Sequence, residues 1–142
     1  MGLLSGKTAL IVGIASKKSI AYGIAKSFHE QGAKLAFTYQ NEKFKSRVEG
    51  FAEEFGSDLV FPCDVAIDAE INSLKNNLCE QWPSLDILVH SVGYAPANEL
   101  EGDMVDVSTR EGFQIAHDIS SYSLIALTSA FKDHLSESAS VL

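Results

Sequence analysis

The sequence predicts an α/β fold built on a doubly wound parallel sheet, and three observations support this fold class. Apolar runs that end in small or polar residues alternate four times with helical patterns between residues 8 and 90. The connections are short, so successive strands need right-handed crossover helices, which then cover both faces of the sheet. The 142 residues are 46% hydrophobic, which is enough to bury the core of one domain.

The first strand and helix are predicted on either side of a glycine. Residues 8–13 form an apolar run that ends in Gly13, which is typical of a strand buried on both faces. Ser19 is a good helix N-cap, and apolar side chains recur every four residues after it. Gly32 supplies the left-handed stop, so we expect the helix to end there.

The same alternation continues to residue 90. Residues 34–39 are predicted as the second strand, and an apolar stripe closed by Gly56 predicts the second helix. A short third strand is expected at residues 59–61, ahead of Pro62. Asp68 is expected to cap the third helix, and residues 85–90 are the fourth strand.

The last third of the chain breaks this regular pattern. Residues 98–108 are polar and acidic and are predicted as a long loop, and residues 109–135 as one long helix with small residues on one flank. Residues 139–142 are expected to open a fifth strand that stops before it can pair. Because a sheet of this Rossmann-like kind has about six strands, residues 1–142 are predicted to form a single, incomplete dinucleotide-binding domain, truncated at the start of the fifth strand.

Composition excludes several classes of function. Lys and Arg number 11 and Asp and Glu 19, so the net charge of −8 disfavours nucleic acid or an anionic membrane surface as partners. Cys63 and Cys79 are not spaced as zinc ligands, and the four histidines lack metal-binding spacing, so no metal site is expected. Two isolated cysteines are typical of a reducing, cytoplasmic environment.

The turn after the first strand is the first candidate site. In a parallel sheet this turn faces the ligand crevice, and the helix N-terminus that follows attracts phosphate groups. The turn contains Gly13, Ser19 and Gly23 but lacks the G-x-G-x-x-G spacing. Spacing alone therefore leaves two interpretations open, a dinucleotide site and an ordinary strand-to-helix turn.

The ends of the second and third strands hold two further candidates. Gln40 stands where many dinucleotide folds place an acidic residue on the ribose. A neutral residue does not repel a 2′-phosphate, and Lys17 and Lys18 could favour one, so NADPH is not excluded beside NADH. Asp64 and Val65 could contact an adenine amino group and its ring, although a loop-capping role for Asp64 is an equal alternative.

Five motifs follow one another along the whole chain: Gly13-x5-Ser19-Ile20-Ala21-x-Gly23, Phe37-Thr-Tyr-Gln40, Cys63-Asp64-Val65, His90-Ser91-Val92-Gly93-Tyr94-Ala95-Pro96 and Thr109-Arg-Glu-Gly-Phe-x-Ile-Ala-His-Asp-Ile-Ser-Ser-Tyr-Ser123. Together they closely resemble the bacterial NADH-dependent enoyl-acyl-carrier-protein reductases, a divergent short-chain dehydrogenase/reductase family. Each motif alone is weak evidence, and the resemblance depends on their order over residues 1–142.

The resemblance implies a function and a set of site residues. The family transfers a hydride from NADH to the β-carbon of a trans-2-enoyl thioester on acyl carrier protein, in fatty-acid synthesis. By this resemblance, residues from four segments bind the cofactor: Gly13, Ala15, Ser19 and Ile20 at the pyrophosphate and ribose, Gln40, Asp64 and Val65 at the adenosine, and Ser91, Val92 and Gly93 at the nicotinamide side. Tyr94, Ala95 and Leu100 border the substrate.

The sequence departs from the family's pattern in one important respect. The resemblance places catalysis on a Tyr-x6-Tyr-x6-Lys pattern after the fifth strand, and the tyrosines here lie in other motifs. No catalytic residue is therefore assigned, and the isolated 142-residue chain is predicted to be inactive.

Two kinds of alternative stay open beside the enoyl reductase hypothesis. One is a ketone or alcohol reductase of the same superfamily, and the other a non-catalytic dinucleotide-binding module. Ketone reductases carry Asn-Asn-Ala-Gly where residues 90–93 read His-Ser-Val-Gly, which favours an enoyl reductase. The flank of small residues Ser120, Ser121, Ser123 and Ala126 is similar to the helix that pairs subunits in the family, which implies a homotetramer.

Overall fold

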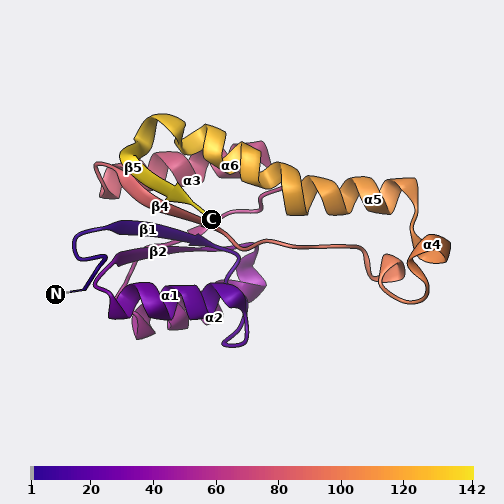
Figure 1. Cartoon of the computed structure of the whole chain (residues 1–142), viewed down its shortest axis with the longest axis horizontal. Coiled ribbons are helices and arrows are strands. Elements are labelled where there is room, and N and C mark those ends of the chain that lie inside the picture. The colour runs from indigo at the N-terminus through magenta and orange to yellow at the C-terminus, as the bar shows by residue number, and fades with distance from the viewer. Residues whose placement is uncertain (1) are drawn as a thin grey trace.

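The computed structural model describes residues 2–142, whose centre is a five-stranded parallel sheet (Figure 1). The strand order is β3-β2-β1-β4-β5, so the chain builds outward from β1 to β3 and then returns to the other side of β1. The predicted doubly wound α/β fold class is confirmed. The strands are β1 (Thr8–Val12), β2 (Lys34–Tyr39), β3 (Val60–Pro62), β4 (Leu85–His90) and β5 (Leu135–Val141).

Helices cover both faces of the sheet (Figure 1). On one face lie α1 (Ile20–Glu30) and α2 (Glu42–Glu54), and on the other α3 (Asp68–Gln81) and α6 (Ser123–Phe131). Successive side chains of β1 enter opposite cores, since Ile11 packs in the first and Leu10 in the second. Burial on both sides explains why β1 reads as an unbroken apolar run.

The helix boundaries confirm one predicted cap and correct another. Ser19 caps α1, where its side chain accepts a hydrogen bond from the backbone N–H of Tyr22. The prediction that Asp68 caps α3 was wrong, because Ile67 occupies the N-cap and Asp68 is the first helical residue. A carboxylate in the first turn still favours the helix, since it lies near the positive end of the helix dipole.

The predicted long helix over residues 109–135 is four elements in the structure. They are α5 (Arg110–His117), the π-helical segment η2 (Asp118–Tyr122), α6 and the 3₁₀ turn η3 (Lys132–His134). The predicted loop over residues 98–108 holds α4 (Met104–Val107) and overlaps the 3₁₀ turn η1 (Ala97–Glu99). In Figure 1 these last two elements and α5 extend well beyond the sheet.

The fifth strand corrects the expectation about the chain's last residues. β5 begins at Leu135 and pairs in parallel with β4, so the expectation that it opens at residue 139 and stops before pairing was wrong. The backbone of Leu142 continues the ladder, donating to the carbonyl of Leu88 at 2.9 Å and accepting from the N–H of His90 at 2.8 Å. The first residues of the strand escaped prediction because its sequence, LSESASV, is largely polar and partly exposed.

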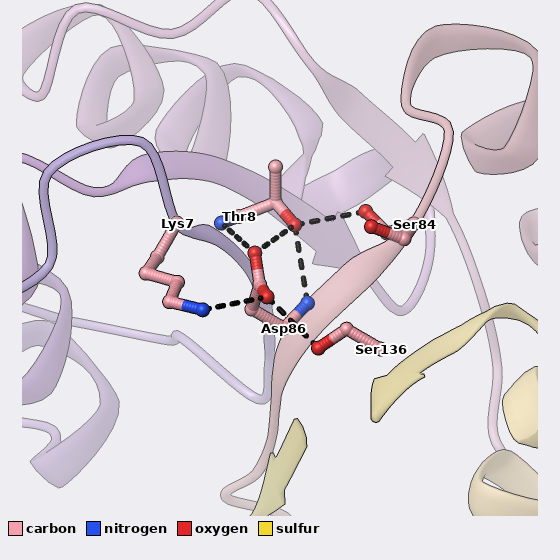
Figure 2. Close-up of polar contacts among 5 residues, drawn as sticks. All are labelled: Lys7, Thr8, Ser84, Asp86 and Ser136. Carbon is pink, nitrogen blue, oxygen red and sulfur yellow. Dashed lines mark hydrogen bonds and ion pairs between the residues drawn. The ribbon is translucent and has the colours of Figure 1, made fainter. Parts of the chain in front are cut away.

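A hydrogen-bonded network closes the amino end of the sheet (Figure 2). The carboxylate of Asp86 on β4 accepts from the Lys7 ammonium at 3.2 Å, the Thr8 N–H at 3.0 Å and the Ser136 hydroxyl at 2.9 Å. Partial burial opposes ionisation of Asp86, but these donors outweigh it and hold the pKa of the carboxyl below its ordinary value. The network therefore links β1, β4 and β5 through one anion.

Candidate functional site

A cavity of about 520 Å³ opens at the carboxyl end of the sheet. Because the strand order reverses between β1 and β4, the connections after these strands diverge and leave a crevice between them. The cavity is lined by the ends of β1, β2 and β4, by the loop after β3, and by α2, α5 and η2: Val12, Gly13, Ile14, Ala15, Thr38, Tyr39, Gln40, Phe44, Cys63, Asp64, Val65, Ser91, Val92, Gly93, Tyr94, Ile115 and Ile119.

The structure brings most of the predicted site residues to this cavity. Four do not line it: Ser19 is occupied as the cap of α1, Ile20 is 78% exposed, Ala95 follows the lining segment, and Leu100 is 69% exposed beyond η1. Some lining residues were not predicted as site residues. Several of these, such as Val12 and Tyr39, are sequence neighbours of predicted site residues at strand ends, and extending each motif by one or two residues would have found them. Ile115 and Ile119 come from the other end of the chain, and only the fold brings them here.

Gly13 holds the ends of β1 and β4 together. Its φ is +105°, and a Cβ built there would lie 1.9 Å from the carbonyl oxygen of Ser91. The N–H of Ser91 donates to the carbonyl of Val12 at 2.8 Å, so the two chains meet at this point. Glycine is therefore required here for backbone packing, in addition to any contact with a ligand.

The N-terminus of α1 is suited to an anion. The helix has eleven residues, and its first turn, which lies wholly within the described part of the chain, carries no acidic side chain. Its unpaired backbone N–H groups give this end a partial positive charge. The Arg47 guanidinium donates to the carbonyl of Ala15 at 3.2 Å, which places a second positive group beside the same turn.

The side of the cavity formed by β2 and β3 is polar at its rim and apolar inside. Gln40 is exposed, whereas Phe44 is half-buried. Asp64 accepts from the N–H of Ala66 at 2.9 Å, so its predicted capping role and a role in the site are compatible. Burial raises the pKa of the Cys63 thiol to about 12, with Glu70 and Asp64 adding to the effect, so this cysteine is neutral and unreactive near pH 7.

The loop after β4 is the most open part of the lining. At Gly93 φ lies outside the left-handed region, and within residues 2–142 no atom beyond its two chain neighbours would come within 4 Å of an added Cβ. Neither backbone strain nor packing within the chain therefore requires glycine at this position. Gly93 lines the cavity and is exposed, and a glycine with room around it allows a ligand to approach the backbone closely.

Hydrogen bonds made by His90 and by the η2 segment hold the two ends of this loop. The His90 Nε2 lies 2.7 Å from the Ser123 Oγ, which also donates to the carbonyl of Ile119 at 2.6 Å. Burial lowers the pKa of His90, so the ring is neutral at pH 7. The Ser120 hydroxyl contacts both the N–H and the carbonyl of Tyr94, at 2.9 and 3.1 Å.

Two of the titratable side chains that line the cavity are poorly suited to proton transfer. Burial raises the pKa of Tyr39 as well as that of Cys63, so neither transfers protons readily near neutral pH. Within residues 2–142 no group of three His, Cys, Asp or Glu side chains could hold a metal ion. No helix in this described range is long and apolar enough to cross a membrane.

Comparison with known proteins identifies relatives over nearly the whole chain. A family model described as enoyl-(acyl carrier protein) reductase matches residues 13–142. The enoyl-(acyl-carrier-protein) reductase (NADH) FabI of Escherichia coli K12 is 55% identical over 142 residues, all of this chain and 54% of that protein. The FabI of Aquifex aeolicus is 62% identical over 128 residues, 90% of this chain and 47% of that protein.

Two solved structures share the fold of this chain. The crystal structure of the Aquifex aeolicus enzyme superposes with a TM-score of 0.95 at 55% identity, over 99% of this chain and 56% of the other. The reductase of Anaplasma phagocytophilum, solved in complex with NAD, gives a TM-score of 0.93 at 39% identity, over 99% of this chain and 54% of the other. The chain thus spans about half the length of the curated relatives it matches.

Proposed function

The chain belongs to the enoyl-(acyl carrier protein) reductase family, and from this premise we propose that the full-length gene product reduces trans-2-enoyl thioesters on acyl carrier protein with NADH, in fatty-acid synthesis. Residues 1–142 provide the cofactor-binding part. The observation that carries the proposal is the cavity at the reversal of strand order, with open space at Gly93 on its β4 side.

The residues present fit a dinucleotide. Gln40, Asp64 and Val65 bind the adenosine end beside β2 and β3. The turn with Gly13, Ala15, Ser19 and Ile20 binds the pyrophosphate, supported by a helix N-terminus without acidic side chains. Ser91, Val92 and Gly93 bind the nicotinamide side of the cofactor, where the loop leaves free space.

The chain's own residues orient the reaction. When bound, NADH supplies the hydride for the β-carbon of the substrate. The apolar side chains of Val92, Ile115 and Ile119 on the cavity wall exclude water from the space beside the loop after β4. Tyr94 and Ala95 precede the η1 segment and Leu100 follows it, and these three residues border the enoyl chain.

The proposal is tested by an assay of the full-length gene product. We expect NADH oxidation that depends on a crotonyl thioester and is absent with an acetoacetyl thioester, with NADPH run in parallel to measure cofactor preference. Turnover of the ketoacyl substrate alone would favour a ketone reductase. Binding of NADH without turnover of either substrate would favour a non-catalytic module. In the same assay, the turnover rate of the isolated 142-residue polypeptide is expected to lie about 100-fold or more below that of the full-length protein.

We also propose that the protein is a homotetramer in the cytoplasm, with acyl carrier protein bearing an enoyl chain as its partner. Ser120 and Ser123 make contacts within their own chain, so the outer side of this segment is formed by neighbours such as Ser121, Tyr122 and Ile125, which are exposed. Ser121→Trp is expected to shift the full-length protein toward smaller species in sedimentation velocity. Unchanged sedimentation with a lowered melting temperature would contradict this interface.

A further inference from the structure

The π-helical segment η2 and the first residue of α6 together contact both ends of one wall of the cavity. The wall is the loop of residues 91–93, which lines the cavity and makes the backbone available to a ligand. The residue before this loop, His90, contacts Ser123, and the residue after it, Tyr94, contacts Ser120. A single helical turn is therefore bonded to the chain on both sides of the loop.

The two contacts differ in chemistry. The Ser123 hydroxyl donates its only proton to the carbonyl of Ile119, so its contact with His90 requires the ring Nε2 to carry the hydrogen and donate it. The Ser120 hydroxyl instead accepts from the N–H of Tyr94 and donates to its carbonyl. Tyr94 lies outside any strand, and one side chain thus satisfies both of its backbone groups.

The π-helical geometry makes these contacts possible. A π turn contains one residue more than an α turn, and so changes the direction in which the following side chains point. In η2 the change occurs between α5, which projects beyond the sheet, and α6, which packs on it (Figure 1). Ile119 of the same segment lines the cavity, so the turn that holds the loop also contributes to the lining itself.

We propose that Ser120 is a positioning residue, which holds the backbone of Tyr94 so that residues 91–93 stay in place to receive the nicotinamide half of the cofactor. This inference rests on the function proposed above. It concerns only the β4 side of the cavity, because the adenosine half is assigned to Gln40, Asp64 and Val65 beyond β1. Loss of the Ser120 hydroxyl should therefore weaken the binding of a whole dinucleotide and spare that of its adenosine half.

The experiment compares Ser120→Ala with Ser129→Ala, a matched substitution at an exposed serine of α6, and with Ser120→Thr, which keeps the hydroxyl. In the full-length protein, NADH and ADP are titrated by calorimetry. For Ser120→Ala we expect the Kd of NADH to rise about 5- to 10-fold, the size expected for one or two lost hydrogen bonds, with the Kd of ADP within about twofold. Ser120→Thr should restore most of the NADH affinity, and Ser129→Ala should match the wild type.

Hydrogen exchange supplies a second measurement, and its wild-type arm does not depend on a variant's folding. In the wild type, the peptide over residues 91–97 should show a protected amide at Tyr94, and Ser120→Ala should increase its deuterium uptake. An unprotected Tyr94 amide in the wild type, an NADH Kd unchanged in Ser120→Ala, or equal weakening of NADH and ADP would each overturn the inference. Failure of the wild type to bind NADH would instead overturn the proposed function, and the inference with it.

Discussion

The two ends of the sheet are built in opposite ways. At the amino end, Asp86 accepts hydrogen bonds from residues of β1 and β5 and from the Lys7 ammonium, so the strands are tied to one another (Figure 2). At the carboxyl end the same strands lead into diverging loops, and Gly93 faces free space. The side chains of one end satisfy one another, whereas those of the other leave a cavity of about 520 Å³.

This difference shows how a parallel sheet separates stability from binding. All strands point the same way, so every strand-to-helix loop lies at one edge and every helix-to-strand loop at the other. Substitutions at the amino end are therefore expected to change the free energy of unfolding and to leave cofactor binding unchanged. Substitutions at the carboxyl end should do the reverse, unless the residue also joins two strands.

Gly13 is that exception and should give the largest effect. Gly13→Ala places a Cβ 1.9 Å from the carbonyl oxygen of Ser91 on a backbone whose φ is +105°. We expect a loss of about 3 kcal/mol or more in the free energy of unfolding, because steric overlap and an unfavourable backbone angle add together. Urea unfolding of the full-length protein measures this. A stability equal to that of the wild type would break the assignment of Gly13 to packing.

The elements of this fold differ in how far the sequence predicts them. Strands buried on both faces, such as Thr8–Val12, and helices with clear caps and stripes could be predicted, because burial imposes an apolar pattern. For β5 only the last residues were predicted as strand, because an exposed edge strand needs no such pattern. The break between α5 and α6 also escaped prediction, because the π turn depends on contacts of Ser120 and Ser123 with residues about thirty positions away.

The candidate site divides in the same way. Strand-end residues such as Gln40 and Asp64 follow predictable strands, so their place in the cavity could be predicted from position. The walls contributed by Ile115 and Ile119 could not, because they depend on how the projecting helix returns to the sheet. Gly13 and Gly93 are both glycines in the sequence. Only the structure shows that Gly13 is required for packing and that Gly93 adjoins open space.

Asp86→Asn tests the amino end and should have the second largest effect. The amide retains the shape of the carboxylate but loses its charge-assisted bonds, so we expect a loss of about 2 kcal/mol in the free energy of unfolding at pH 7. The Kd of NADH should stay within about twofold of the wild-type value. A tenfold change in NADH affinity with unchanged stability would contradict the separation of the two ends.

The pH dependence of this variant has a definite sign. The pKa of Asp86 is lowered in the folded protein, so the unfolded chain binds the proton more readily and the stabilising contribution exists above the unfolded pKa, near 3.8. It is lost as the pH falls below that value and through the folded pKa. The difference in stability between wild type and Asp86→Asn should thus be constant from pH 7 to about 5 and shrink below about 4, as measured by urea unfolding.

Gly93→Val tests the open end and should have the smallest effect on stability. Because no atom of the described residues beyond the two chain neighbours lies within 4 Å of an added Cβ and φ is outside the left-handed region, the melting temperature should stay within a few degrees of the wild-type value. The valine side chain would occupy the space where the nicotinamide side of the cofactor meets the backbone. The Kd and KM of NADH should then rise about tenfold or more, the effect of one badly placed apolar group in a binding pocket.

Two controls make this last comparison decisive. ADP, for which we propose a site near Gln40, should bind Gly93→Val as it binds the wild type. Gly50→Val introduces the same side chain at a helical glycine whose added Cβ also meets no atom within 4 Å in the described chain, so it controls for the substitution itself. The helix propensity of valine is no worse than that of glycine, so the substitution should not weaken the helix. If Gly93→Val instead unfolds, or if its folded fraction binds NADH with wild-type affinity, the free space at Gly93 is not part of the cofactor site, and the assignment of the loop after β4 to the nicotinamide side fails.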